Sequence, residues 1–241
     1  MFFKNIIEEI NYLDDEEKFF LLGTLFSLLF SVSFFFYFYR KSKEIIDFSD
    51  IPFIQISFCY LNNLSFYFLS DVMIQEYMKL LCKINIGITI LLILIYLIYQ
   101  IFIDKIDALL NFLIIICSSW AGKKLLIDIL NSEKEIKIVC GCVTLSLYLS
   151  MFEWISRALT EKNKYIINGF TPFTMLLTTG CWSIYGYIYD EFFFYIPNLV
   201  GFGITIIFIG CFLFIKFKYP EIEKKGEAQE INETKENKKN K

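Results

Sequence analysis

Seven runs of mostly apolar residues constrain this chain more than any other feature of its sequence. Each run is about 20 residues long. As a helix that rises about 1.5 Å per residue, it would cross a hydrocarbon layer of about 30 Å. None alternates strictly between apolar and polar residues, as the strands of a membrane barrel do. We therefore expect an all-α membrane protein with seven transmembrane helices, at residues 18–39, 51–70, 80–103, 106–122, 138–155, 171–189 and 192–214.

The segments outside these runs are too short for a further domain. Residues 1–17 are polar and acidic, without the basic start and small-residue cleavage site of a signal peptide. Residues 219–241 are charged and almost devoid of apolar side chains, so we expect a disordered tail. The net charge of −3 gives no sign of a nucleic-acid partner, and the lipid bilayer is the expected surrounding.

Cysteine and histidine exclude several kinds of site. The seven cysteines lie in the apolar runs or at their edges, none forms a CxxC pair, and the chain contains no histidine. The chain therefore lacks the residues that are typical of zinc sites, haem attachment and Cys–His catalysis. We expect no metal and no cofactor, and without a catalytic pair we do not expect an enzyme.

Polar landmarks occur in the same order in the two halves of the chain. Along the first three runs the chain has an arginine at the end of the first run, then a proline and an asparagine, and the last three runs repeat this order at similar intervals (Arg40, Pro52 and Asn85; Arg157, Pro172 and Asn198). Two three-helix units lie parallel if one helix between them returns the chain to its starting side. We expect such a 3+1+3 plan, although two apolar stretches can also resemble each other by chance. Its parts are a polar segment 1–17, a first repeat 18–103, a linker helix and loop 104–137, a second repeat 138–218 and a tail 219–241.

Polar residues recur every three or four positions in the runs, so they share one face of each helix. In the fifth run this face is Cys142, Ser146, Ser150, Glu153 and Arg157, of which the last two are expected to pair at the helix end. The fourth run has few polar residues and is expected at the periphery.

Two interpretations of these faces stay open. Small hydroxylated residues let helices approach closely, so the faces can be packing surfaces. They can also enclose a polar cavity, because the amides of Asn85 and Asn198 each need several hydrogen-bond partners. Trp182 adds an aromatic surface on which a sugar can stack.

The sixth and seventh runs contain a recognisable motif. Trp182-x-x-Tyr185-Gly186, then Asp190, then Pro197-Asn198-x-x-Gly201 resembles the SWEET sugar-transporter family, whose members show W-x-x-Y-G, an acidic residue and P-N-x-x-G. The resemblance extends over about residues 20–217 and is specific in the last third. It implies two parallel triple-helix repeats and facilitative sugar uniport by alternating access between them.

By this resemblance the substrate is a small neutral solute, a mono- or disaccharide, with its binding residues at Asn85, Asn198, Trp182, Thr178 and Ser27. Pro52 and Pro172 would act as gating hinges. The family's prolines in the first and fifth helices have no counterpart, because Phe34 stands at the first position and residues 150–152 lack proline.

Two other functions stay open. A PQ-loop-like carrier of amino acids or other small solutes shares the broad fold, but the chain has no Pro-Gln dipeptide. A seven-helix cargo receptor of the secretory pathway would need charged groups in its cavity to hold a peptide carboxylate.

Basic residues give a small bias in orientation. Nine lie on the side of the membrane that holds the C-terminus (Arg40, Lys41, Lys43, Lys105, Arg157, Lys162, Lys164, Lys216 and Lys218). Seven lie on the opposite side (Lys4, Lys18, Lys79, Lys123, Lys124, Lys134 and Lys137). We expect a cytosolic C-terminus and an N-terminus outside. The plasma membrane is expected rather than an endomembrane, and assembly into a homo-oligomer is left open.

Overall fold

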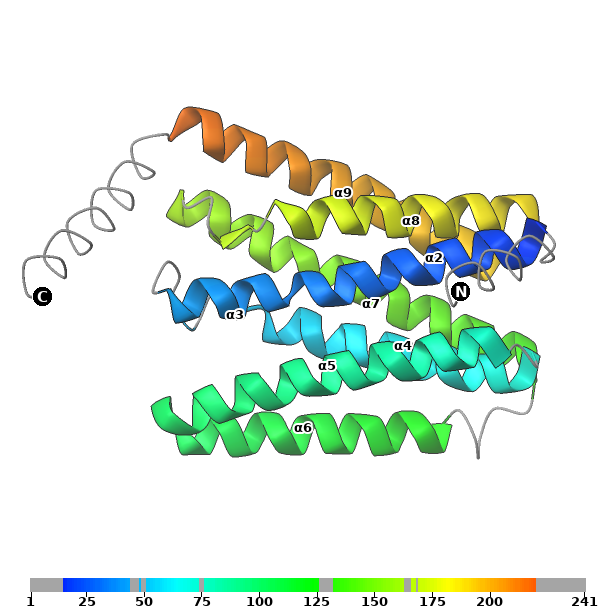
Figure 1. Cartoon of the computed structure of the whole chain (residues 1–241), viewed down its shortest axis with the longest axis horizontal. Coiled ribbons are helices and arrows are strands. Elements are labelled where there is room, and N and C mark those ends of the chain that lie inside the picture. The colour runs from blue at the N-terminus through cyan, green and yellow to red at the C-terminus, as the bar shows by residue number, and fades with distance from the viewer. Residues whose placement is uncertain are drawn as a thin grey trace, which may run out of the picture.

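The computed structural model describes residues 15–43, 48, 51–73, 76–125, 132–162, 166–167 and 169–219, and its helices run nearly parallel to one axis (Figure 1). In chain order they are α2 (Asp15–Ser33), α3 (Phe35–Ser42), α4 (Phe53–Met73), α5 (Glu76–Ile103), α6 (Lys105–Lys124), α7 (Glu133–Glu161), α8 (Phe170–Ile188) and α9 (Phe192–Lys218). Because α2 and α3 form one span, this part of the chain makes the seven helices that were predicted. The predicted tail lies outside the described residues, apart from Tyr219.

Five of these spans are long and apolar enough to cross a membrane by length and composition alone: α2–α3, α5, α6, α7 and α9. The other two, α4 and α8, carry more amide and hydroxyl side chains, among them Asn63, Thr174 and Thr178, which are buried inside the protein. Polar groups at membrane depth are expected to face the interior, where they find partners or line a cavity.

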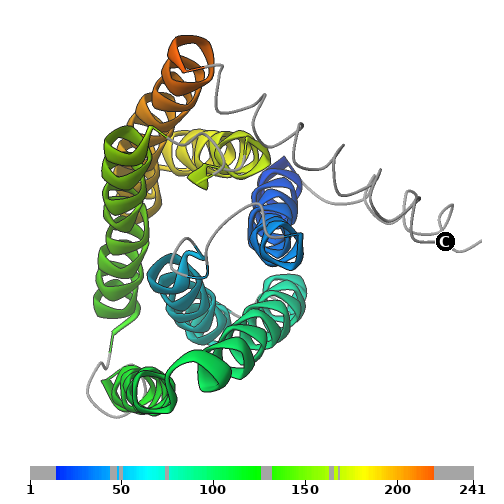
Figure 2. The ribbon, with the colours of Figure 1, turned by 90° about the vertical axis from the view of Figure 1, so that its left-hand side faces the viewer.

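Six of the seven spans form a closed ring (Figure 2). Passing around it, each helix packs on the next in the order α2, α5, α4, α7, α9, α8 and back to α2. The first bundle (α2, α4, α5) and the second bundle (α7, α8, α9) have the same arrangement, with the third helix between the other two. The bundles meet at two seams, α2 with α8 and α4 with α7.

Helix α6 lies outside the ring against α5 (Figure 2), as its small number of polar residues predicts. Asp104 caps its start by accepting hydrogen bonds from the backbone of Ile106 and Asp107 at 2.8 and 3.3 Å. Asn111 Nδ2 donates to Gln100 Oε1 of α5 at 2.9 Å, so the linker helix is fastened to the first bundle. The repeat boundaries at 18–103 and 138–218 stay a prediction.

The first span is interrupted at Phe34, although it contains no proline. The backbone N–H of Phe34 reaches back three residues to the Ser31 carbonyl at 3.3 Å, and Tyr37 N–H likewise to Phe34 at 3.1 Å. Ser33 Oγ donates to the Phe30 carbonyl at 2.6 Å. Serine hydroxyls that bond the preceding turn commonly bend helices, which accounts for a break at Phe34, where the resemblance described above implied a proline.

The two prolines predicted as hinges lie at helix starts. Pro52 directly precedes α4, and Pro172 is in the first turn of α8, where a missing N–H costs no helical hydrogen bond. Their hinge role stays a prediction.

The motif between α8 and α9 forms a tight turn. Asp190 has a φ of 56°, and Glu191 N–H donates to the Gly186 carbonyl at 2.8 Å. A Cβ on Gly186 would meet the backbone of Tyr195 and the Glu191 carbonyl. Glycine is therefore required at 186 for the two helices to approach, which explains the glycine of the W-x-x-Y-G motif.

Two apolar clusters fill the ends of the ring. The N-side cluster lies at the end where α2 begins and consists of Phe20, Leu69, Cys82, Ile136, Cys140, Trp182, Tyr185 and Phe194. The C-side cluster lies toward the end where α9 finishes, and its largest members are Phe34, Tyr37, Met151, Trp154 and Phe208. What lies between them is the candidate site.

Candidate functional site

A central cavity of about 40 Å³ lies between the two clusters, with walls from all six helices of the ring. None of the described residues that line it is charged. All five predicted binding residues, Ser27, Asn85, Thr178, Trp182 and Asn198, line this one cavity. Further polar groups in its walls are Thr24, Ser31, Asn62, Asn63, Thr144 and Tyr148. The cavity interpretation of the polar faces therefore has a structural basis, while the binding role of each residue stays a prediction.

Both the oxygen and the nitrogen of the Asn198 amide are hydrogen-bonded to protein groups. Its Oδ1 accepts a hydrogen bond from the Tyr148 hydroxyl at 2.7 Å, and its Nδ2 donates to the Phe194 carbonyl one turn earlier at 2.8 Å. Gly201 lies against the ring of Tyr148, where a Cβ would overlap the ring atoms. The glycine of P-N-x-x-G thus makes room for the tyrosine that engages the asparagine.

Asn85, its counterpart in the first bundle, is only 1% exposed, yet its Oδ1 has no hydrogen-bond partner. A buried polar atom without a partner costs about 1–3 kcal/mol. Asn85 therefore offers the cavity an open acceptor, whereas the corresponding acceptor of Asn198 already has one protein partner.

Trp182 connects the cavity to the N-side cluster. Its Nε1 donates to Ser27 Oγ at 3.1 Å across the α2–α8 seam. Its ring stacks on Phe194, with centroids 5.6 Å apart and planes 18° apart, and Phe20 meets it edge-on at 4.9 Å. A Cβ on Gly23 would lie 3.0 Å from the indole, so this glycine lets α2 pack against it.

The other seam has its own hydrogen bonds. Thr144 Oγ1 of α7 donates to Asn62 Oδ1 of α4 at 2.6 Å, beside the cavity. Further toward the C-side, Gln55 Nε2 donates to the Ser150 carbonyl at 2.7 Å, and Gln55 is 1% exposed. Both seams therefore join the bundles through side-chain hydrogen bonds that a separation of the bundles would break.

Among the residues that the structure describes, aromatic contacts close both ends of the ring. On the C-side, Tyr37 and Trp154 meet with ring centroids 4.6 Å apart, and Phe208 lies 6.3 Å from Trp154. On the N-side, Phe194 and Phe66 flank Trp182 at 5.6 and 5.9 Å. A cavity of about 40 Å³ has room for a few water molecules but not for a sugar ring. The structure is a closed conformation.

The predicted polar face of the fifth span is wrong. Cys142 and Glu153 are exposed, and Arg157 pairs with Glu161 at 3.4 Å rather than with Glu153. Ser146 Oγ donates to the Cys142 carbonyl of its own helix at 2.9 Å, which lets a serine face outward without an unpaired hydroxyl. The buried face holds Thr144, Leu147, Tyr148, Met151 and Trp154 instead.

Tyr148 is the cavity residue that the sequence interpretation missed. It is one of 15 tyrosines in a chain rich in aromatic residues, so composition gave it no prominence. The available signal was its place four residues after Thr144, on the same helical face. Among the residues that the structure describes, no group of three or more potential metal ligands occurs.

Comparisons with known proteins give one family-model match and a similar solved fold. Residues 132–221 match a family model described as a sugar efflux transporter for intercellular exchange. Among curated proteins, none matches the sequence. The fold is similar to a solved structure of a eukaryotic SWEET transporter, with a TM-score of 0.61 and 14% identity, over 81% of this chain and 94% of that one. The predicted all-α fold with seven membrane helices in two three-helix bundles and a linker is confirmed.

Proposed function

We propose that this chain belongs to the SWEET sugar-transporter family and carries a sugar across a membrane as a uniporter, because residues 132–221 match a model described as a sugar efflux transporter and the fold is similar to that of a SWEET transporter. The observation that carries the proposal is the uncharged polar cavity between the two bundles, closed at each end by an apolar cluster. A site between two like bundles suits alternating access, in which one end opens while the other stays closed.

The chemistry of the cavity favours a neutral, hydroxyl-rich substrate, a mono- or disaccharide. Amides donate and accept hydrogen bonds, and so can serve the hydroxyl groups of a sugar. An amino acid or a peptide carboxylate would place a charge where none of the described lining residues can balance it, at a large desolvation cost. The amino-acid carrier and the cargo receptor are therefore less well supported.

Sugar binding would exchange protein hydrogen bonds for substrate hydrogen bonds. A sugar hydroxyl can replace the Tyr148 hydroxyl on Asn198 Oδ1, and another can fill the open Oδ1 of Asn85. Trp182 would turn from Ser27 toward the substrate. Because protein bonds are exchanged rather than simply added, we expect modest affinity, which suits a carrier that must release its substrate.

Opening would separate the bundles at one end at a time. The C-side would open by parting Tyr37 from Trp154, and the N-side by parting Phe20 and Phe66 from Trp182 and Phe194. Pro52 and Pro172 would act as hinges at the starts of α4 and α8. The break at Phe34 would take the place of the proline missing from the first helix.

A direct test is uptake of radiolabelled hexoses and disaccharides in a transport-null host expressing this chain. We expect saturable uptake that is reduced in Asn198→Ala and Trp182→Ala at matched expression. Ser118→Ala, in the peripheral α6, should transport normally. Well-expressed protein that moves none of these sugars would overturn the proposal.

We further propose a plasma-membrane location with the N-terminus outside and the C-terminus cytosolic, from the bias in basic residues. Asn232-Glu233-Thr234, outside the described residues, is a glycosylation sequon. On expression in a secretory host it should remain unmodified. A glycosidase-sensitive mass shift that Asn232→Gln removes would reverse the orientation.

A further inference from the structure

A second hollow lies outside the ring, between the linker helix α6 and the first bundle. This linker groove has a volume of about 440 Å³ and takes its walls from α4, α5 and α6. Its surface is almost wholly apolar, with Leu64, Phe68, Ile93, Leu97, Phe112 and Ile116 among its lining residues. Ser119, also in its wall, donates its hydroxyl to the Ile115 carbonyl at 2.6 Å. The interior of the groove therefore suits a hydrocarbon occupant.

The length of the groove matches one leaflet of a bilayer. On α6 its lining extends from Phe112 to Lys123, which is about 17 Å at about 1.5 Å per residue. The whole of α6, Lys105–Lys124, is about as long as the hydrocarbon core is thick, roughly 30 Å. The groove thus begins at one membrane boundary and ends near the midplane. A transmembrane helix of a second copy would extend across both leaflets, whereas an acyl chain, like this groove, extends over one leaflet.

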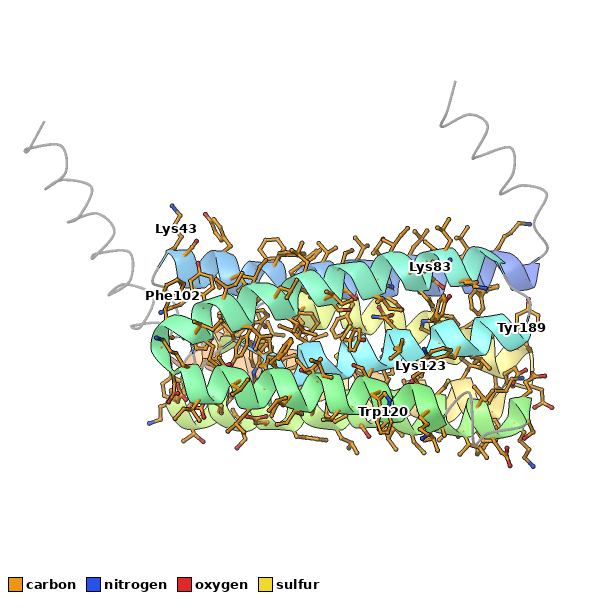
Figure 3. The ribbon with its side chains drawn as sticks, turned by 90° about the horizontal axis from the view of Figure 1, so that it is seen from below. Lys43, Lys83, Phe102, Trp120, Lys123 and Tyr189 are labelled. Carbon is orange, nitrogen blue, oxygen red and sulfur yellow. The ribbon has the colours of Figure 1, made fainter. Side chains whose placement is uncertain are left out.

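Positive charge lies at the boundary end of the groove. Lys123 is the single charged residue among the described residues that line the groove. Lys124 Nζ lies 5.1 Å from the ring centroid of Trp120, another lining residue. Because α5 and α6 run antiparallel from their junction at Asp104, Lys83 of α5 lies at the same level (Figure 3). Tryptophan and lysine are the residues expected where lipid headgroups begin.

We propose that the linker groove binds one anionic glycerophospholipid, with an acyl chain among the apolar side chains and the phosphate at Lys123 and Lys124. The lipid would fill the space that α6 leaves beside α4, since α6 packs mainly on α5. It would hold the linker helix to the first bundle on the N-side, as Asn111 and Gln100 hold it toward the C-side.

Native mass spectrometry of the purified full chain, with palmitoyl-oleoyl phosphatidylglycerol added to the detergent, tests this site. We expect one lipid retained per chain, more tightly than phosphatidylcholine. Lys123→Gln should weaken retention about fivefold, the effect of one basic residue near a charged headgroup. Lys105→Gln, which removes a lysine from the opposite end of the same helix, should leave retention unchanged.

A second pair of variants tests the apolar part. Ser119→Phe fills the groove and should abolish retention, while Cys117→Phe places the same ring on the exposed side of α6 and should not. If Ser119→Phe does not fold, Leu94→Phe fills the groove from α5.

Three results would overturn the proposal. One is equal retention in the groove-filling variant and Cys117→Phe. Another is binding of free glycerol phosphate at the same affinity, which would make the site an anion site without an acyl chain. The third is a dimer that the groove-filling variant dissociates, which would make the groove an interface between copies.

Discussion

Asn85 and Asn198 occupy equivalent places in the two bundles, but their surroundings differ. Asn198 has a phenol on its acceptor and a backbone carbonyl on its donor, whereas the acceptor of Asn85 is buried without a partner. A made hydrogen bond contributes about 0.5–1.5 kcal/mol net, and an unmade buried one costs about 1–3 kcal/mol. Substrate should therefore gain more at Asn85, where nothing is displaced, than at Asn198, where it competes with Tyr148.

Tyr148→Phe removes the competitor on Asn198 and keeps the ring that packs on Gly201. We expect the KM for sugar uptake to fall by roughly two- to tenfold, because the substrate no longer displaces a protein hydrogen bond. Asn198→Ala should raise KM by a similar factor. The measurement is concentration-dependent uptake at matched expression. A rise in KM for Tyr148→Phe would mean that the phenol itself binds the sugar.

Asn85→Leu replaces an unsatisfied amide with an apolar side chain of similar size. Thermal stability in detergent should stay the same or increase, since a buried acceptor without a partner is removed. Uptake should nevertheless fall, because the open acceptor for the substrate is gone. Asn198→Leu is the matched comparison, and it should lower the melting temperature by stranding the Tyr148 hydroxyl. If Asn85→Leu destabilised the protein as much, Asn85 would have a packing role.

At this scale the sequence predicted which amides and which indole line the cavity, but not their hydrogen-bond partners. Asn85, Asn198 and Trp182 stand out because polar and amphipathic side chains are rare in apolar runs. Tyr148 and the outward-facing Ser146 could not be assigned in this way. A serine can satisfy its hydroxyl on its own helix, so its presence does not say which face is buried.

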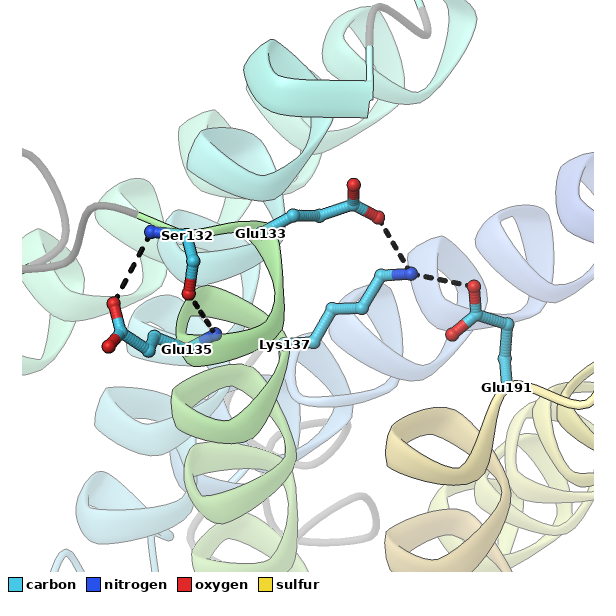
Figure 4. Close-up of polar contacts among 5 residues, drawn as sticks. All are labelled: Ser132, Glu133, Glu135, Lys137 and Glu191. Atoms are coloured by element: carbon cyan, nitrogen blue, oxygen red, sulfur yellow. Dashed lines mark hydrogen bonds and ion pairs between the residues drawn. The ribbon is translucent and has the colours of Figure 1, made fainter.

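At the scale of helices, local side-chain chemistry sets the starts and breaks. Serine hydroxyls accompany the interruption of the first span at Phe34, and Ser132 with Glu135 forms a capping box that starts α7 at Glu133 (Figure 4). The apolar pattern placed this start at residue 138, five residues late. The S-x-x-E spacing in the sequence was the signal that would have corrected it.

Lys137 joins two helices of the second bundle on the N-side. Its Nζ lies 2.6 Å from Glu191 at the start of α9 and 2.8 Å from Glu133 on its own helix (Figure 4). Lys137→Met should lower the melting temperature. We expect the free energy of unfolding to fall by an amount between the ~0.2–1 kcal/mol of an exposed pair and the ~3–5 kcal/mol lost on breaking a buried one. The Lys137 side chain is 12% exposed and that of Glu191 is 25% exposed, which places the pair between these limits.

Thermal melts of the purified protein measure this effect, with Lys134→Met, an exposed neighbour on the same helix, as the control. Lys137→Arg should retain most of the stability, because it can still reach both carboxylates. Equal losses in Lys137→Met and Lys134→Met would show that the ion pair does not hold α7 to α9.

At the scale of the whole molecule, the closed ring brings both seams to the cavity, so the hydrogen bonds between the bundles lie where substrate would enter. The sequence predicted two parallel three-helix units and a peripheral linker from the order of polar landmarks. It did not predict the order of helices in the ring, because many helix faces carry similar small and aromatic residues. The closure of both ends depends on aromatic contacts between residues far apart in the chain, such as Tyr37 and Trp154.

Transport should be passive. The described lining of the cavity contains no charged group, and Glu153 is exposed on α7. In proteoliposomes the internal sugar concentration should rise to the external concentration and no further, with or without a proton gradient, and Glu153→Gln should behave in the same way. Accumulation above the external concentration that a protonophore abolishes would contradict this.

The contact between Trp182 and Ser27 closes the ring across 155 residues of sequence. During synthesis, at roughly 5–20 residues per second, the first span therefore waits roughly 8–30 s for the helix that completes its surroundings. Over that interval Ser27 and the surface at Gly23, where Trp182 will pack, face lipid or another protein. The last seam to form is also one that lines the cavity, so a substitution there can lower the yield of assembled protein before it alters any transport rate.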